Sequence, residues 1–201
     1  MKKVVMIFMS LALVAPFSIA EQGIENVWKA STKEVGQAKY DRLSQDELQD
    51  ACSTKGGVKE GYDVNVLRQK AQESIVYPKY ETFDPSYYLG DWKNGESIAK
   101  NGKGLQYNDD PKDPNGGNCY ACHQMAQEEV AYGTLGTTLQ NYGMRGQSEV
   151  MMQYTWAKIY NPHVYNVCSM MPRFGVNGIL TEQQMKDVMA YLLDPNSPVN
   201  N

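Results

Sequence analysis

The hydrophobic pattern of the chain predicts short helices joined by polar loops. The clearest helix lies near the C-terminus, where a Thr-x-x-Gln capping box begins at Thr181 and Asp194-Pro195 ends the helical pattern. Four apolar residues of this run fall at positions i, i+3, i+4 and i+7: Met185, Val188, Met189 and Leu192. They share one helical face, which we expect to pack into the core.

Capping and stop signals predict further helices upstream. Ser148 precedes a helical segment that Asn161-Pro162 ends. Ser44 and Glu47 form a second capping box, followed by a glycine pair at residues 56–57. The helices predicted in this way cover residues 45–53, 64–76, 95–100, 123–130 and 149–160. The predicted fold class is therefore all-α.

The first twenty residues have the features of a secretory signal peptide. Lys2 and Lys3 give a positive start, residues 4–15 are apolar, and small residues at positions 18 and 20 suit a cleavage site. The apolar stretch is too short to span a bilayer. Cleavage after Ala20 would leave Glu21, not a cysteine, at the new N-terminus. We therefore expect a soluble, periplasmic protein without a membrane anchor.

Composition sets the remaining bounds. Residues 21–201 hold 17 Lys and Arg against 23 Asp and Glu, a formal charge of −6, which disfavours nucleic acid and anionic membranes as partners. Their length suits one domain with an extension, which we place at residues 91–201 and 21–90 respectively. The Tyr-rich segment 77–88 is interpreted as extended chain that either packs on this domain or docks a partner.

A Cys-x-x-Cys-His motif at residues 119–123 carries the candidate chemistry. Cys119 and Cys122 can each form a thioether with one porphyrin vinyl group, and His123 then places an imidazole under the iron. One motif indicates one haem c. A thioredoxin-like dithiol would need a strand before the motif, where the chain has a Pro/Gly/Asp-rich loop. A zinc site would need four Cys or His ligands at zinc-like spacing, which the chain lacks.

The second axial ligand must come from a distant part of the chain. Methionines within the predicted helices are better explained as core packing. Outside them remain Met144, Met170 and Met171, and Pro172 stiffens the loop after the last two. His163 is a rival from the same region, but its simpler interpretation is a solvent-facing residue just past a helix.

Two cysteines lie outside the motif, Cys52 and Cys168. In an oxidising compartment the simplest account is a disulfide, which would join the extension to the methionine loop. The alternative is that Cys168 is a free thiol near the haem, able to bind iron or carry sulfur.

The order of these elements resembles a class I cytochrome c. A short helix, the haem motif, a Gly-bearing loop, a middle helix, a methionine loop and a last amphipathic helix follow one another along the chain. The resemblance implies that the first and last of these helices cross, with Gly95 permitting their close approach. It also implies a distal ligand in a Met-Pro pair, which favours Met171, with Met170 second.

Several stretches between Trp92 and Asn200 resemble more narrowly the SoxX family, the small monohaem cytochrome c subunits of sulfur-oxidising SoxAX complexes. They are residues 117–123, 133–136, 168–175 with Met-Pro-Arg-Phe-Gly, 177–184, 192–195 with Leu-Leu-Asp-Pro, and 197–200.

The SoxX resemblance implies an electron-transfer subunit that pairs with a SoxA-like catalytic subunit carrying one or two haems. Such a complex joins thiosulfate oxidatively to a cysteine of the carrier SoxYZ, an L-cysteine S-thiosulfotransferase reaction. Bond formation is expected on SoxA, and this chain would pass electrons to an acceptor cytochrome c. The resemblance assigns haem attachment to Cys119 and Cys122, axial ligation to His123 and Met171, and no catalytic residue to this chain. The rival functions are a free-standing periplasmic electron carrier and a haem sensor or catalyst with an open iron position.

Overall fold

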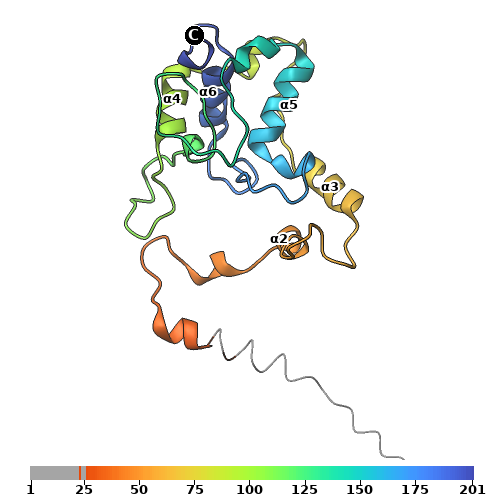
Figure 1. Cartoon of the computed structure of the whole chain (residues 1–201), viewed down its shortest axis with the longest axis vertical. Helices are drawn as coiled ribbons and strands as arrows, with labels where there is room; N and C mark the ends of the chain where they lie inside the picture. The colour runs from red at the N-terminus through yellow and green to blue at the C-terminus, as the bar shows by residue number, and fades with distance from the viewer. Residues whose placement is uncertain (1–22, 24–25) are drawn as a thin grey trace, which may run out of the picture.

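The computed structural model describes residue 23 and residues 26–201, in which the elements are helical and no β-strand is present (Figure 1). The expected signal peptide lies outside these residues. The α-helices beyond residue 32 are α2 (Glu47–Ala51), α3 (Val64–Glu73), α4 (Trp92–Lys100), α5 (Glu149–Tyr160) and α6 (Glu182–Leu193). The 3₁₀ helices are η1 (Tyr40–Leu43), η2 (Pro85–Tyr87), η3 (Cys119–Ala121), η4 (Tyr142–Arg145), η5 (Pro162–Val164) and η6 (Pro198–Asn200). The predicted all-α class is confirmed.

Helices α4 and α6 form the centre of the domain, and their close approach depends on Gly95. A Cβ atom at this position would lie 2.0 Å from the backbone oxygen of Asp187 and 2.8 Å from Cβ of Tyr191, so only glycine fits between the helices. The buried Asp187 carboxylate also accepts a hydrogen bond of 2.9 Å from the backbone amide of Asp91, the residue that caps α4. The crossing expected of the first and last helices is therefore present.

Helix α6 follows its sequence signals closely. Thr181 and Gln184 form the predicted capping box, and the four residues predicted to share one face, Met185, Val188, Met189 and Leu192, are all buried. Ser148 likewise caps α5 as expected. Both helices therefore begin where a side-chain oxygen takes up an amide that the first turn leaves unpaired.

The Tyr-rich segment 77–88 packs on α5. Tyr88 is fully buried with its ring 5.8 Å from that of Trp156, and Tyr80 donates a hydrogen bond of 2.7 Å to Glu149. Trp156 in turn donates from Nε1 to the backbone oxygen of Val76. The sequence left two interpretations of this segment open, and in the structure it packs on its own domain. The main core begins at Ala71 and includes this segment.

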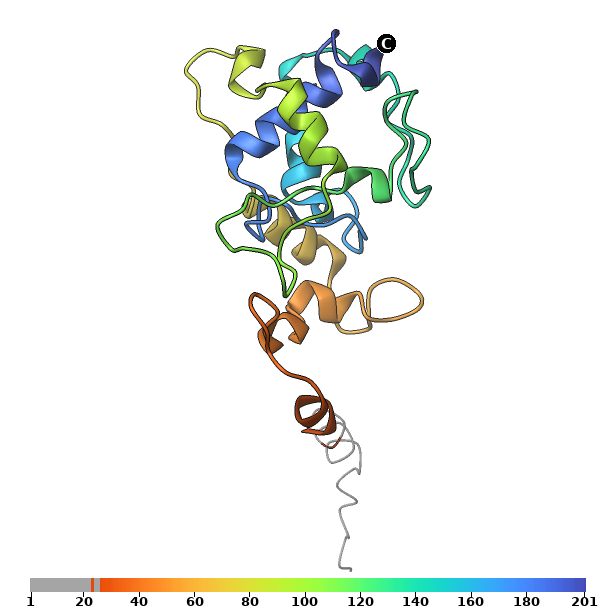
Figure 2. The same cartoon turned by 90° about the vertical axis from the view of Figure 1, so that its left-hand side faces the viewer.

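A smaller hydrophobic cluster lies beside the main core and joins the extension to the domain. Leu48 and Ala51 of α2, Leu67 of α3 and the loop residue Val167 form its buried part. N-terminal to α2, residues 26–46 lead away from the domain as an arm (Figures 1 and 2). The arm contacts the loop before the haem motif, where Gln37 Nε2 donates to the backbone oxygen of Asp109 and Arg42 donates to that of Leu105.

The helix predicted over residues 123–130 is absent, and the reason is competition for its backbone carbonyls. Amides of the following loop bond to the carbonyls of three alternate residues: Gly133 N–H donates to Tyr120 O, Gly136 N–H to Cys122 O and Leu139 N–H to Gln124 O. Because these carbonyls are bonded to a returning loop, they are not available for a helical ladder.

The predicted start of α2 is wrong by two residues. Asp46, not Ser44, is the cap: its carboxylate accepts from Gln49 N–H at 2.9 Å, and Gln49 Oε1 accepts from Asp46 N–H at 3.0 Å. The chain offers two overlapping capping boxes, and the one with the carboxylate forms. Helix α3 ends at Glu73, short of the predicted Val76, because the Ser74 hydroxyl bonds back to Ala71 O.

Candidate haem site

The haem motif is held against α4 and α6 by hydrogen bonds on both sides. Before it, Gly117 N–H donates to the backbone oxygen of Ile98 in α4 at 2.8 Å. Within it, the buried Tyr120 hydroxyl lies 2.7 Å from that of Tyr191 in α6 and accepts from Ala126 N–H. These hydrogen bonds fix the motif, which includes the 3₁₀ turn η3, against the α4–α6 pair.

Cys119 and Cys122 are both partly buried free thiols and do not pair with each other. Burial raises the pKa of the Cys119 thiol to about 12, so this sulfur is protonated at neutral pH until it is alkylated. Both sulfurs are thus available for thioether bonds, which is the state that haem attachment requires.

His123 is oriented by the loop that follows it. Its Nδ1 atom lies 2.7 Å from the backbone oxygen of Thr137, and since a carbonyl can only accept, Nδ1 carries the proton. The lone pair of Nε2 is then free to bind a metal, as in most metal-bound histidines. A Cβ atom on Gly136 would lie 2.3 Å from Cε1 of the ring, so the backbone of the loop packs directly on the imidazole.

These residues fit a covalent haem. Two free sulfurs and an imidazole whose Nδ1 bonds to a backbone carbonyl lie in one turn of chain, which is the donor set of c-type haem attachment. When bound, haem supplies one-electron chemistry at iron. The chain supplies the two attachment points and the proximal nitrogen.

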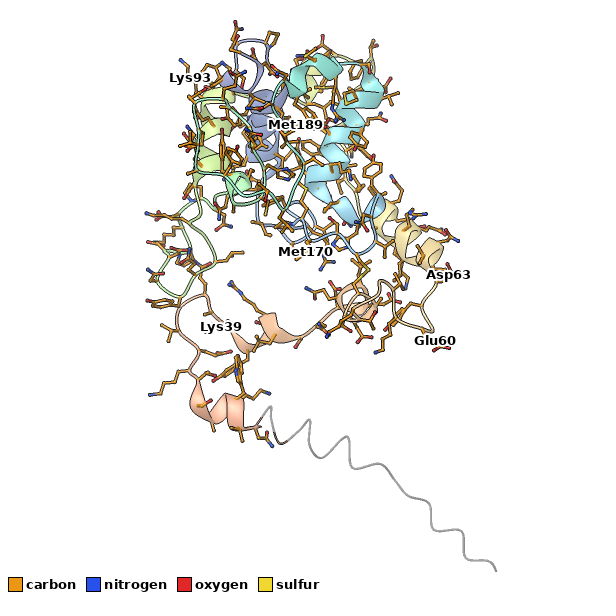
Figure 3. The ribbon with its side chains drawn as sticks, viewed as in Figure 1. Lys39, Glu60, Asp63, Lys93, Met170 and Met189 are labelled. Atoms are coloured by element: carbon orange, nitrogen blue, oxygen red, sulfur yellow. A yellow bond between two sulfur atoms is a disulfide. The ribbon has the colours of Figure 1, made fainter. Side chains whose placement is uncertain are left out.

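The structure separates the candidate distal methionines by burial. Met170 is 77% exposed and Met144 is 86% exposed, whereas Met171 is partly buried and packs against the main core. In Figure 3, Met170 lies at the lower edge of the domain and Met189 lies inside it. Met125, Met152, Met185 and Met189 are all buried, as expected of core residues.

His163 is not the solvent-facing residue that its position after a helix suggested. It is buried, and its Nδ1 donates to the backbone oxygen of Val167 in the smaller cluster. Burial lowers the pKa of its imidazole, which is therefore held in the neutral form. His163 is buried because η5, in which it lies, packs against α3 instead of leading the chain into solvent.

Cys52 and Cys168 form a disulfide, with their Cα atoms 5.4 Å apart. It joins the end of α2 to the start of the methionine loop. Arg173, beyond Met171 in the same loop, pairs with Asp46 at the other end of α2 at 2.5 Å.

Three contributors to the site carry no clear local signal. The Thr137 carbonyl is a backbone group, so no side-chain pattern could indicate it. Asp46 and Arg173 are 127 residues apart and meet only through the fold. The Gly-Thr-Leu-Gly turn at residues 133–136 does mark the loop that packs on His123, although its role there is visible only in three dimensions.

Comparison with known proteins agrees with this geometry. The family model for cytochrome c matches residues 99–194, a span that includes the motif, the methionine loop and α6. A protein of Aquifex aeolicus strain VF5, named an uncharacterized lipoprotein, is 36% identical over 207 residues, covering 96% of each chain. No described helix has the length and apolar character needed to cross a membrane. The chain thus contains a cytochrome c domain, with a covalently bound haem c, and is related to the Aquifex protein over nearly its whole length.

Proposed function

We propose that this protein is a periplasmic monohaem cytochrome c that passes single electrons. Cys119 and Cys122 attach the haem, His123 binds iron on the proximal side and Met171 on the distal side. The observation that carries this proposal is the hydrogen bond between His123 Nδ1 and the backbone oxygen of Thr137. This bond leaves Nε2 free to bind iron, and the carbonyl sets the orientation of the imidazole ring.

A pair of strong axial ligands restricts the chemistry. Neither side of the iron is then open to a substrate, and a methionine thioether favours the reduced iron. The Thr137 carbonyl orients His123 and the main core packs against Met171, so these ligands would need little rearrangement when the charge on iron changes. This combination suits electron transfer and disfavours both a sensor and a catalyst with an open iron position.

Within that class, we propose the role of the electron-transfer subunit of a SoxAX complex. The support is the SoxX-like sequence around the methionine loop, Met-Pro-Arg-Phe-Gly, and at the end of α6, Leu-Leu-Asp-Pro. Thiosulfate would be conjugated to a cysteine of SoxYZ on a SoxA-like partner, and the two released electrons would leave one at a time through this chain to an acceptor cytochrome c.

The arm is consistent with a permanent partner. Three of its apolar side chains are largely exposed: Val27, Val35 and Leu43. A free-standing carrier has no need of such a segment, whereas a permanent subunit interface is larger and more apolar than a transient one.

Co-purification tests the proposal. Tagged protein is isolated from cells grown with thiosulfate, with cells grown without it as the control, and the eluate is stained for haem after electrophoresis. The SoxAX role predicts a second haem-staining band in constant ratio and reduction of the purified complex by thiosulfate in the presence of SoxYZ. A monomer that no thiosulfate system reduces would overturn this role in favour of the free-standing carrier.

A further inference from the structure

Helix α2 contacts the methionine loop at two points, one on each side of Met171. At its C-terminal end, Cys52 is bonded to Cys168, three residues before Met171. At its N-terminal end, Asp46 pairs with Arg173, two residues after Met171. A helix of the N-terminal extension therefore spans the segment that presents the proposed distal ligand.

The side of this segment that faces α2 is not closely packed, although Met171 also contacts the main core. The described structure has an open pocket of about 410 Å³ between α2 and the loop, lined by Leu48 on one side and by Met170, Met171 and Arg173 on the other. Next to Met171, Pro172 has no amide to donate, and Met171 N–H bonds only locally, to Ser169 Oγ at 3.2 Å. Close packing, which normally fixes a side chain, is thus missing on the α2 side.

The two ends of the segment are anchored independently of α2. Phe174 is buried in the main core, and Gly175 N–H donates to the backbone oxygen of Tyr160. Val167 is buried in the smaller cluster. Residues 168–173 lie between these two anchors, and they include the proposed ligand and both loop partners of α2.

We propose that α2 acts as a splint: Asp46 and Cys52 are positioning residues that hold Met171 at the distal side of the iron. This rests on the assignment of Met171 in the proposed function. The haem site of this protein therefore includes an element that lies some 120 residues away in sequence from its ligand.

Two variants test the splint. In Cys52→Ser/Cys168→Ser the covalent link is lost, while the haem-attaching cysteines remain. In Asp46→Ser the partner of Arg173 is lost, but serine still caps α2, so the helix itself is preserved. The matched control is Glu47→Ser, which removes the neighbouring carboxylate and its ion pair with Lys70 of α3 at 2.6 Å but leaves the Asp46–Arg173 pair in place.

The readout separates positioning from stability. Each protein is unfolded in guanidinium chloride and followed by the near-infrared sulfur-to-iron band of the oxidised haem, which reports Met171, and by far-ultraviolet circular dichroism, which reports the helices. A purely structural disulfide or ion pair would move both midpoints together. Loss of a splint lets the loop open first, so the band is lost at lower denaturant than the helices.

We expect coincident midpoints in the wild type and in Glu47→Ser, and separated midpoints in both splint variants. In the absence of denaturant, Cys52→Ser/Cys168→Ser with ferrous haem should bind carbon monoxide about tenfold faster than the wild type. This ratio corresponds to a free energy of loop opening that is lower by about 1.4 kcal/mol. Coincident midpoints and unchanged carbon monoxide binding in both splint variants would overturn the proposal. A wild type without the band would instead overturn the assignment of Met171 itself.

Discussion

The two sides of the haem site are built over very different distances along the chain. His123 is oriented by Thr137, 14 residues away, and the surrounding loop bonds back to residues 120–124. The segment around Met171 is tied instead to α2, by a disulfide that spans 116 residues and an ion pair that spans 127. The orientation of His123 is therefore set within one short segment, although the motif also packs on α4 and α6, whereas the proposed distal side is complete only when the extension has folded onto the domain.

The largest expected effect comes from cutting the long-range link. Cys52→Ser/Cys168→Ser should lower the free energy of unfolding by about 4–5 kcal/mol, because the disulfide closes a loop of more than one hundred residues in the unfolded chain. The measurement is equilibrium denaturation of wild type and variant under oxidising conditions. A decrease in the free energy of unfolding of less than about 1 kcal/mol would mean that other contacts hold α2 in place. The long-range disulfide would then not distinguish the distal side from the proximal one.

On the proximal side, one added methyl group next to the His123 ring should lower the free energy of unfolding. Gly136→Ala places a Cβ against the His123 ring, and overpacking of this kind costs about 1–3 kcal/mol. Denaturation of this variant is compared with that of Gly56→Ala, where a Cβ would meet nothing within 4 Å. If the two variants are equally stable, the loop does not hold His123 as described.

A smaller effect is expected in how the free energy of unfolding depends on pH. Because burial lowers the pKa of His163 on the distal side, the unfolded chain binds a proton that the folded chain resists. The stability that this residue contributes is complete above about pH 6.5 and is lost as the pH falls below it. Unfolding free energies measured at several pH values should therefore fall on acidification in the wild type. The fall should be smaller in His163→Gln, and equal slopes would contradict the assignment of the effect to His163.

The Asp46–Arg173 pair adds a second acid-sensitive contact. Partial burial opposes ionisation of Asp46, but the hydrogen bonds from Gln49 N–H and Arg173 outweigh it, and the pKa of this carboxyl lies below its ordinary value. Its contribution is therefore present above about pH 4 and lost at more acid pH. Both titrating contacts belong to the distal side.

Local signals predicted the elements that local physics controls. Helices α5 and α6 follow from their caps and from the periodicity of residues such as Met185 and Val188, and the haem motif was evident from its spacing. The region after His123 was predicted as helix because nothing near it in sequence shows that Gly133 and Gly136 return to take its carbonyls. The burial of His163 and the pairing of Asp46 with Arg173 likewise depend on contacts between segments far apart, which periodicity and capping do not encode.

The most direct test of the account is the near-infrared spectrum of the oxidised protein in three forms. Wild type and Met170→Ala should show the weak sulfur-to-iron band, because the Met170 side chain is exposed and its removal leaves the ligand in place. Met171→Ala should lack the band while retaining the covalently bound haem. A band that persists in Met171→Ala, or disappears in Met170→Ala, would contradict the assignment on which the distal half of the site depends.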